Sequence, residues 1–394
     1  KIFLFVIIVS FSITVSGCKD IENNNLSLET IDFINVSNVF EGENHKIEKV
    51  MVPGAGDHTF YGSKLYFVGE DDKFAEDSIV KKGIFSFDIN TQSRRLLFEI
   101  PQGVSINELM AYNNDYLFFR MHTYGEESVT CKLLINENEL IILSNEQDID
   151  SGFMPRRSLS DNYLAWFESI ESKTSLKVSV SILEINSDKK RTLNDNVYIE
   201  SPYLIPNIRE GILSYIKIKS ENYILSDVLD KIRSSSKTEE NIDDITDITN
   251  LLEIELFDLT KQEKISIPMP DIKSPIEDIT HPIGVVISNN FYTIFYNRQN
   301  EVYVYDHEKE IWSYFKPRNE IFSLDIYKHL VIITDNRIGG IYCYNLKTSE
   351  IMRLTSELPY QGYILTKVTM DGKLLSQFGR GQDVAIIFDL EKIL

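Results

Sequence analysis

Short apolar stretches that alternate with polar residues recur along this chain, and each one ends in an acidic or amide residue. Gly83 to Thr91 reads Gly-Ile-Phe-Ser-Phe-Asp-Ile-Asn-Thr, which is an alternating strand followed by a polar turn. Similar stretches lie at 131–136, 182–186, 254–258, 302–306, 341–345 and 385–389. Their terminal Asp or Asn residues are 39 to 50 residues apart, except for one interval of 72. Periods of about 40–50 residues are typical of propellers and solenoids.

Each period contains four apolar segments separated by Asn, Asp, Gly and Ser clusters. In the first period they cover 64–68, the Gly83 stretch, 95–100 and a segment near 108–112 that leads into the next period. The later second segments are 116–119, 163–167, 211–215, 291–296, 330–334 and 373–377. The pattern therefore predicts an all-β fold, a seven-bladed β-propeller of four-stranded blades.

The two ends of the repeat region complement each other. After Asp389 only five residues remain, so the seventh blade lacks a fourth strand. Near the start, 45–52 is an alternating segment without a blade of its own. Pairing this strand with the last blade removes an exposed edge. We therefore expect an N-terminal strand to close the ring.

The long interval is explained by an insertion at 221–250 in blade four. Five apolar residues fall on one helical face, followed by a Ser-rich break and an acidic run from Glu239 to Asp247. They are Ile224, Leu225, Val228, Leu229 and Ile232. The insertion either docks a partner or folds back as a lid on its own blade, and the lid is favoured because inserted loops usually cover their own scaffold. The acidic run lacks the spacing and Gly of a calcium loop, which favours a solvated face over a calcium site.

The first residues are typical of a targeting segment. Lys1 precedes a long apolar run that ends in Val15-Ser16-Gly17-Cys18. This run resembles a bacterial lipoprotein signal with its lipobox. The resemblance implies cleavage before Cys18, attachment of diacylglycerol, with acyl chains such as palmitate, to that thiol, and tethering to the extracytoplasmic face of the cell membrane. A transmembrane anchor and an ordinary signal peptide are the alternatives, although the run is short for a spanning helix. The expected organisation is signal peptide at 1–17, lipidated Cys and tether at 18–44, and propeller at 45–394.

Charge and cysteine content limit the partners. Sixty acidic and 40 basic residues give a net charge of −20, which opposes binding to nucleic acid. Cys131 and Cys343 lie in repeats two and six, so we expect two separate buried thiols instead of a disulfide. The chain is expected to be a monomer.

No catalytic motif is recognisable, and no catalytic residue, metal ligand or cofactor is predicted. The chain has no Gly-x-Ser-x-Gly, no His-Glu-x-x-His and no phosphate-binding Gly-rich loop, and its six His residues are scattered. A site on a propeller forms where the loops before the second strands converge at the channel mouth. The candidate binding residues there are His58, Arg156, Arg157, Tyr203 and His281.

The repeats resemble those of bacterial propeller lipoproteins with TolB-like or quinoprotein-like repeats, over residues 45–394. This resemblance implies a binding or scaffold module for an envelope protein or glycan, without catalysis. An extracytoplasmic hydrolase or lyase acting on glycans is the alternative, and it requires carboxylates at the channel mouth.

Overall fold

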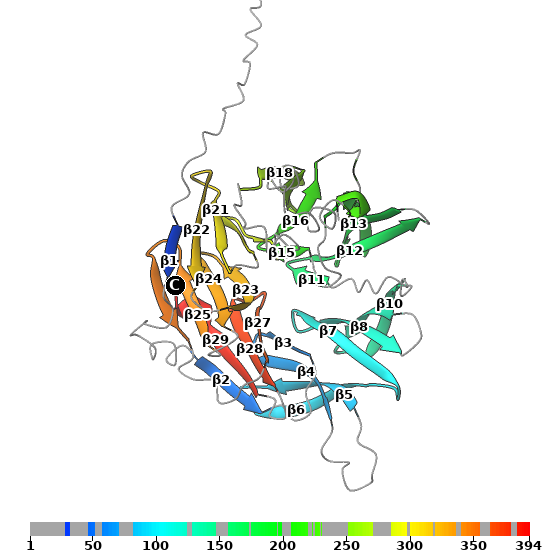
Figure 1. The fold of residues 1–394 in the computed structure, drawn as a ribbon. Coiled ribbons are helices and arrows are strands. Elements are labelled where there is room, and N and C mark those ends of the chain that lie inside the picture. The colour runs from blue at the N-terminus through cyan, green and yellow to red at the C-terminus, as the bar shows by residue number, and fades with distance from the viewer. Residues whose placement is uncertain are drawn as a thin grey trace, which may run out of the picture.

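The chain forms a seven-bladed β-propeller in the computed structural model (Figure 1). Seven antiparallel sheets surround a central axis, and within the described residues the only helical segments are short. The described residues are 28–31, 46–51, 57–70, 82–123, 128–146, 157–172, 175–194, 196–198, 206–219, 223, 225–228, 230, 251–270, 285–297, 300–317, 320–335, 340–354, 363–379 and 384–394. The predicted fold is confirmed.

Each of the first four blades consists of four strands that follow one another in the chain. Blade 1 contains β3 (His58–Tyr61), β4 (Lys64–Glu70), β5 (Lys82–Asp88) and β6 (Ser93–Glu99). Blade 2 contains β7 (Val104–Tyr112), β8 (Tyr116–Thr123), β9 (Ser128–Leu134) and β10 (Glu139–Glu146). Blade 3 contains β11 (Arg157–Ser160), β12 (Tyr163–Ser172), β13 (Ser175–Glu184) and β14 (Lys189–Asn194). Blade 4 contains β15 (Asn207–Arg209), β16 (Ile212–Ile218), β17 (Leu252–Asp258) and β18 (Glu263–Pro268).

The last three blades include both N-terminal strands. Blade 5 contains β19 (Ile287–Ser288), β20 (Tyr292–Tyr296), β21 (Val302–Asp306) and β22 (Ile311–Pro317), with β1 (Leu28–Ile31) at its outer edge. Blade 6 contains β23 (Ile321–Tyr327), β24 (Leu330–Asp335), β25 (Ile341–Asn345) and β26 (Glu350–Arg353). Blade 7 contains β27 (Tyr363–Val368), β28 (Lys373–Gly379), β29 (Val384–Asp389) and β2 (Lys46–Met51). A short 3-10 helix, η5 (Leu390–Lys392), follows β29.

The repeated acidic residue is a turn former at the end of the third strand of a blade. Asp88 Oδ1 accepts hydrogen bonds from the backbone N–H groups of Asn90 at 2.9 Å and Thr91 at 3.3 Å. Asp258, Asp306 and Asn345 make the same pair of bonds to the residues two and three positions later. The side chain thus satisfies backbone donors that the turn leaves unpaired.

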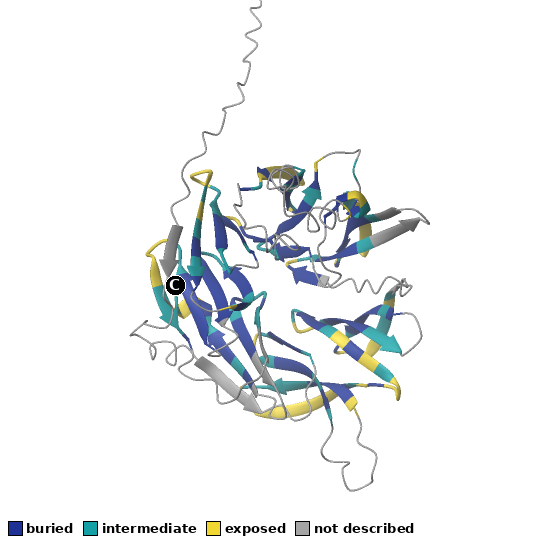
Figure 2. Ribbon diagram, viewed as in Figure 1, coloured by how far each residue is buried: buried dark blue, intermediate teal, exposed yellow. Residues whose placement is uncertain are grey.

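The core lies between neighbouring blades, because the second strands are buried on both faces. On β4, Leu65 and Phe67 pack against Leu375 and other residues of blade 7, whereas Tyr66 packs with Leu117 of blade 2. Successive side chains of a strand point to opposite faces, so each face must be apolar to contact a different blade. This explains why the second segments are nearly continuous apolar runs. Figure 2 shows the middle strands buried and the outer strands more exposed.

The ring closes through the predicted N-terminal strand. β2 pairs antiparallel with β29, and Val50 lies opposite Ala385 in the register. β2 thus supplies the fourth strand of blade 7, whose other three strands come from the C-terminal end. The expected closure is confirmed.

β1 is a further N-terminal strand that the sequence pattern did not reveal. It pairs parallel with β22, from Leu28 opposite Tyr314 to Ile31 opposite Pro317. Blade 5 therefore has five strands. The N-terminal region contributes one strand to blade 5 and one to blade 7.

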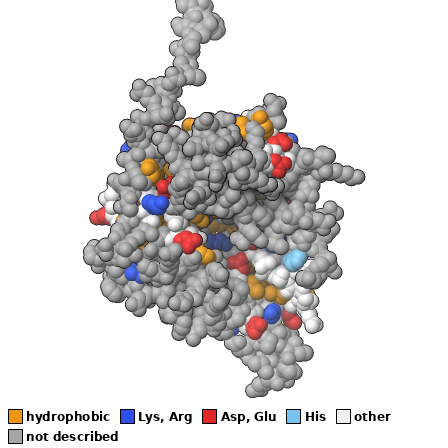
Figure 3. Space-filling view, in the orientation of Figure 1, with side chains coloured by type: hydrophobic (Ala, Val, Ile, Leu, Met, Phe, Trp, Pro, Cys, Tyr) orange, Lys and Arg blue, Asp and Glu red, His pale blue; other side chains and the backbone are white. Residues whose placement is uncertain are grey.

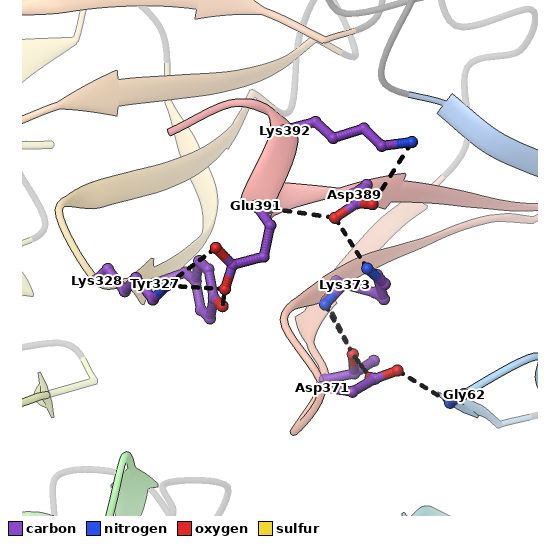
Figure 4. Close-up of polar contacts among 9 residues, drawn as sticks. Gly62, Tyr327, Lys328, Asp371, Lys373, Asp389, Glu391 and Lys392 are labelled. Carbon is purple, nitrogen blue, oxygen red and sulfur yellow. Dashed lines mark hydrogen bonds and ion pairs between the residues drawn. The ribbon is translucent and has the colours of Figure 1, made fainter.

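Polar contacts connect the closing blade to both of its neighbours (Figure 4). The N–H of Gly62 in blade 1 donates to Asp371 Oδ2 of blade 7 at 2.9 Å. On the other side, Lys328 of blade 6 donates to Glu391 at 2.8 Å, and the Tyr327 hydroxyl donates to the same carboxylate. Short-range contacts between neighbouring blades therefore reinforce the junction.

The insertion in blade 4 has helical structure where it is described. Residues 225–228 are helical, and Leu225 and Val228 are fully buried in the core cluster shared by blades 3, 4 and 5. Residues three apart lie on one helix face, so this face packs on the propeller. The helical part of the prediction is confirmed for these residues, and the acidic run at 239–247 lies outside the described residues.

Cys131 and Cys343 are separate thiols. Cys131 on β9 and Cys343 on β25 are both buried and free, as predicted. Burial raises the pKa of the Cys343 thiol to about 12, so this side chain stays protonated and behaves as a small apolar residue.

Candidate functional site

The first strand of each blade faces the axis of the ring. Along the chain β3 contacts β7, and the same relation links β7 to β11, β11 to β15, β15 to β19, β19 to β23 and β23 to β27. β28 of blade 7 contacts β3 and completes the circle. These strands therefore surround a central channel. Charged side chains on them, and on the residues next to them, form the candidate site.

A buried ion pair joins two blades that are not neighbours. Arg209 on β15 donates from Nε to Asp325 Oδ1 at 3.0 Å and from Nη2 to Asp325 Oδ2 at 2.9 Å. Blade 5 separates blade 4 from blade 6, so this bidentate pair spans the inner side of a whole blade. Asp325 Oδ2 also accepts the backbone N–H of Val368 in blade 7 at 3.1 Å. One carboxylate thus connects blades 4, 6 and 7.

Lys367 makes a second contact that skips a blade. Its Nζ donates to the backbone oxygen of Leu109 on β7 at 3.2 Å. Lys367 lies in blade 7 and Leu109 in blade 2, with blade 1 between them. The Lys367 residue is partly exposed.

Asp57 connects Leu109, the residue whose carbonyl accepts a hydrogen bond from Lys367, to blade 1. Asp57 Oδ2 accepts the N–H of Leu109 at 2.7 Å, and its Oδ1 accepts the N–H of His58 at 3.0 Å. Two positions further on, Thr59 Oγ1 accepts the N–H of Ala111. Two sets of contacts thus meet on strand β27 of blade 7. Arg209 and Asp325 reach it at the backbone of Val368, and Leu109 and Asp57 reach it through the Lys367 ammonium. Together they include groups from blades 4, 6, 7, 2 and 1.

A strained bulge places a further carboxylate next to this chain. Glu108 has φ +60°, and the pairing of β7 with β8 shifts between Asn107 and Met110. Every other described non-glycine residue with positive φ lies in a turn or a connection between strands. Glu108 Oε1 lies 3.9 Å from Nη2 of Arg120, and the Arg120 side chain is buried whereas that of Glu108 is partly buried. Backbone strain of this kind concentrates at functional sites.

The position of Lys367 changes the chemistry of its ammonium. Burial lowers the pKa of Lys367 below its usual range, whereas the negative charge of Asp57 acts in the opposite direction. Arg209 lowers the pKa further, and Glu108 and Asp325 raise it. These charges therefore act on one another electrostatically. Figure 3 shows Lys or Arg atoms deep in the hollow at the centre of one face, with Asp or Glu atoms beside them.

A second ionic cluster lies on blade 4, where it stabilises the sheet of that blade. Glu255 on β17 is 1% exposed, and its carboxylate pairs with Lys217 at 3.1 Å and Lys264 at 3.0 Å. Burial pushes the pKa of Glu255 upward, but hydrogen bonds from Tyr215, Lys264 and Lys217 outweigh burial and hold this pKa below its usual range. All four residues lie on neighbouring strands of one sheet, which is the arrangement of stabilising cross-strand pairs.

The structure describes the predicted binding residues only in part. His58 is the first residue of β3 and is 3% exposed, with its ring stacked on Phe67 at 6.2 Å. Arg157 begins β11, and its side chain is outside the described part. Arg156, Tyr203, His281 and Cys18 lie outside the described residues. Their binding and lipidation roles stay predictions.

The sequence analysis missed the charged residues of the channel. Arg209, Asp325 and Lys367 each lie inside a first strand and next to apolar residues. The signal that identifies these three residues is a charged side chain in the first strand of a blade, where the strand contacts strands of the neighbouring blades on both sides. Among the described residues there is no group of three or more His, Cys, Asp or Glu side chains placed to hold a metal ion.

Comparison with known proteins shows similarity of fold. No protein-family model and no curated protein matches the chain. A prolyl endopeptidase structure matches with a TM-score of 0.51 and 8% identity over 85% of this chain. This chain spans 50% of that endopeptidase. An oligogalacturonate lyase in complex with manganese has a TM-score of 0.50 and 9% identity, over 87% of this chain and 97% of the lyase. An oligogalacturonate lyase from Vibrio parahaemolyticus has a TM-score of 0.50 and 10% identity, over 86% and 91%.

Proposed function

We propose that this chain is a membrane-tethered, extracytoplasmic binding or scaffold module that holds an envelope protein or glycan at its channel without chemical change. The observation that carries the binding role is the convergence of charged groups from five blades on one channel. Such a convergence of polar groups in a concave surface is the usual form of a ligand site.

The hydrogen bonds that the channel carboxylates accept favour binding over catalysis. Both oxygens of Asp325 accept N–H groups of Arg209, and both oxygens of Asp57 accept backbone N–H groups. A general acid or base must exchange a proton with its substrate. Carboxylates whose oxygens already accept N–H groups of the protein are better suited to positioning a ligand than to exchanging a proton with it.

The membrane address rests on the sequence around Cys18. In the part of the chain that the structure describes, no helix is long and apolar enough to cross a membrane. Replacing Cys18 with Ala should abolish labelling by radioactive palmitate and release the protein from membranes. The matched control Cys131→Ala should keep both label and membrane association. Unchanged membrane association of Cys18→Ala would contradict the proposed address.

Binding without chemistry is tested on the mature protein purified in detergent. We expect saturable calorimetric binding of an envelope oligosaccharide or peptide, with the ligand mass unchanged after incubation. The paired replacement Arg209→Met with Asp325→Leu should weaken this binding, because it removes charges from the channel. The control Lys309→Ala, on an exposed outer turn, should not. Unchanged affinity in the Arg209→Met and Asp325→Leu double variant would contradict the proposal that the ligand binds in the channel.

A glycan-active hydrolase or lyase is the second candidate. Three carboxylates in the channel favour it, those of Asp57, Glu108 and Asp325. Two proteins of similar fold are lyases that act on oligogalacturonate, although identities of 9% and 10% carry only the fold. Shortened products in the mass spectrum, lost in Asp57→Asn or Glu108→Gln, would support this candidate against binding alone.

A further inference from the structure

Among the channel residues that the structure describes, one cation is not balanced by direct contact with an acid. Arg209 pairs with Asp325, and Arg120 lies 3.9 Å from Glu108. Lys367 forms no ion pair with a carboxylate of the described residues, and its one hydrogen bond there goes to the neutral carbonyl of Leu109. An ammonium group has three N–H donors, so this bond leaves two for another partner.

An unpaired ammonium in a partly buried position is costly. Burial lowers the pKa of Lys367, which means that its surroundings disfavour the charge. Asp57, Glu108 and Asp325 offset this only at a distance, and Arg209 opposes them. An anionic group placed against Nζ would form the missing ion pair in a site where water screens little.

The hydrogen-bond acceptors around Lys367 indicate which other groups the anionic ligand has. Each carboxylate oxygen has two lone pairs, so oxygens that already accept an N–H group still accept a hydroxyl. Asp57 Oδ2 accepts the N–H of Leu109, and the carbonyl of the same residue accepts the Lys367 ammonium, so a carboxylate acceptor lies near the cation. A ligand with many hydroxyls and a carboxylate matches this combination of carboxylate acceptors and one available cation.

We propose that the channel binds an acidic oligosaccharide, with a sugar carboxylate ion-paired to the ammonium of Lys367. This inference rests on the proposed binding function, and it deepens it by naming the ligand class and the residue that selects for negative charge. Binding requires the protonated amine. Affinity is therefore present below the pKa of Lys367 and is lost as the pH rises through it.

The test measures Lys367 itself in the full mature protein. The Nζ and Cε signals of isotope-labelled lysines are titrated by NMR with D-glucuronate and with D-glucose, which differ in one carboxylate. We expect glucuronate to raise the pKa of Lys367 by about one unit, equivalent to a tenfold preference for the charged form. Glucose should leave that pKa unchanged. Glutarate, a carboxylate without a sugar ring, should act more weakly than glucuronate.

Variants separate a binding role from a structural one. Lys367→Met keeps the apolar stem and should weaken glucuronate binding at least tenfold. The matched control Lys373→Met, whose ammonium already pairs with Asp389 at 2.9 Å, should not. The wild-type titration decides the question if Lys367→Met fails to fold.

The outcomes are distinct. An unmoved Lys367 pKa at saturating glucuronate overturns the proposal. An equal shift with glutarate overturns the sugar assignment and points to acidic peptides. A ligand that binds the channel while Lys367 is unaffected overturns this inference but leaves the proposed binding function standing. The absence of any channel ligand overturns both.

Discussion

Arg209 and Asp325 are 116 residues apart in the chain, and they form a bidentate ion pair between blades 4 and 6. The pair passes blade 5 on the channel side and is largely buried. It joins parts of the ring that share no strand pairing. The pair is therefore both a tertiary tie and part of the candidate site.

Breaking this pair on one side should be costly. We expect Asp325→Leu to reduce the free energy of unfolding by about 3–5 kcal/mol, because the Arg209 guanidinium would be left buried without its partner. Urea unfolding followed by circular dichroism measures this change. The double replacement Arg209→Met with Asp325→Leu should recover most of the loss, since no unpaired charge remains. As a control, Lys309→Ala breaks an exposed pair and should cost less than about 1 kcal/mol. Equal losses in the single and double variants would contradict the ion-pair explanation.

The closing strand should matter far more than the additional one. Replacing 46–51 by a Gly-Ser segment of equal length removes β2 and exposes the edge of β29. We expect the Tm to fall by several degrees, since each kcal/mol shifts Tm by about 2–4 °C in domains of 150–250 residues. The matched control replaces 28–31, which only adds a fifth strand to blade 5. Scanning calorimetry compares the two. A larger fall for the 28–31 variant would mean that β1, and not β2, secures the ring.

Two partly buried histidines should make stability depend on pH. Burial lowers the pKa of His307 below 6.5, although a backbone contact at Asn290 and the charge of Asp306 oppose this. Its ring contacts Thr293 Oγ1 at 2.9 Å. Between the folded pKa and 6.5 the unfolded chain binds more protons, so the free energy of unfolding rises with pH and falls as the pH drops below 6.5.

The slope from one such group reaches at most about 1.4 kcal/mol per pH unit. Urea unfolding between about pH 5 and 7.5 covers this window. His307→Asn should reduce the slope. Burial also lowers the pKa of His329. His329→Asn should therefore remove a second, independent contribution to the slope of the free energy of unfolding against pH. A slope that neither replacement changes would assign the pH dependence to other groups.

Two glycines with similar backbones should differ in their tolerance of a side chain. Gly372 has φ +73° and Gly103 has φ +82°, so Ala at either position pays a left-handed backbone cost of about 1–2 kcal/mol. At Gly372 the new Cβ would also meet the phenol ring of Tyr327, with Cζ at 2.8 Å, whereas nothing lies within 4 Å at Gly103.

We therefore expect Gly372→Ala to lower the free energy of unfolding by about 1–3 kcal/mol more than Gly103→Ala, from overpacking. Adding Tyr327→Ala should remove most of this difference, because the ring that the Cβ meets is gone. Chemical denaturation of Gly372→Ala, Gly103→Ala, Tyr327→Ala and the Gly372→Ala with Tyr327→Ala double variant gives the comparison. Identical losses for the two single glycine variants would show that the Tyr327 ring moves aside without cost.

The local features of this propeller follow from the sequence because they depend on residues close together in the chain. The Asp88 side chain bonds N–H groups only two and three residues away, so its role as a turn former is visible in the repeat itself. The apolar second strands and the closing strand β2 follow from periodicity and from the need to pair every edge. For the same reason the buried face of the inserted helix, with Leu225 and Val228, was predictable.

The channel site depends on tertiary structure alone. Lys367 and Leu109 are 258 residues apart, and no local pattern relates them. Which charge meets which group depends on the curvature of the ring, because first strands from separate blades come together only after all seven blades have packed. Alternation in the sequence determined that this chain folds as seven blades. Closure of the ring places Arg209 against Asp325, whereas Lys367 has no carboxylate partner among the described residues and can bind a ligand in the channel.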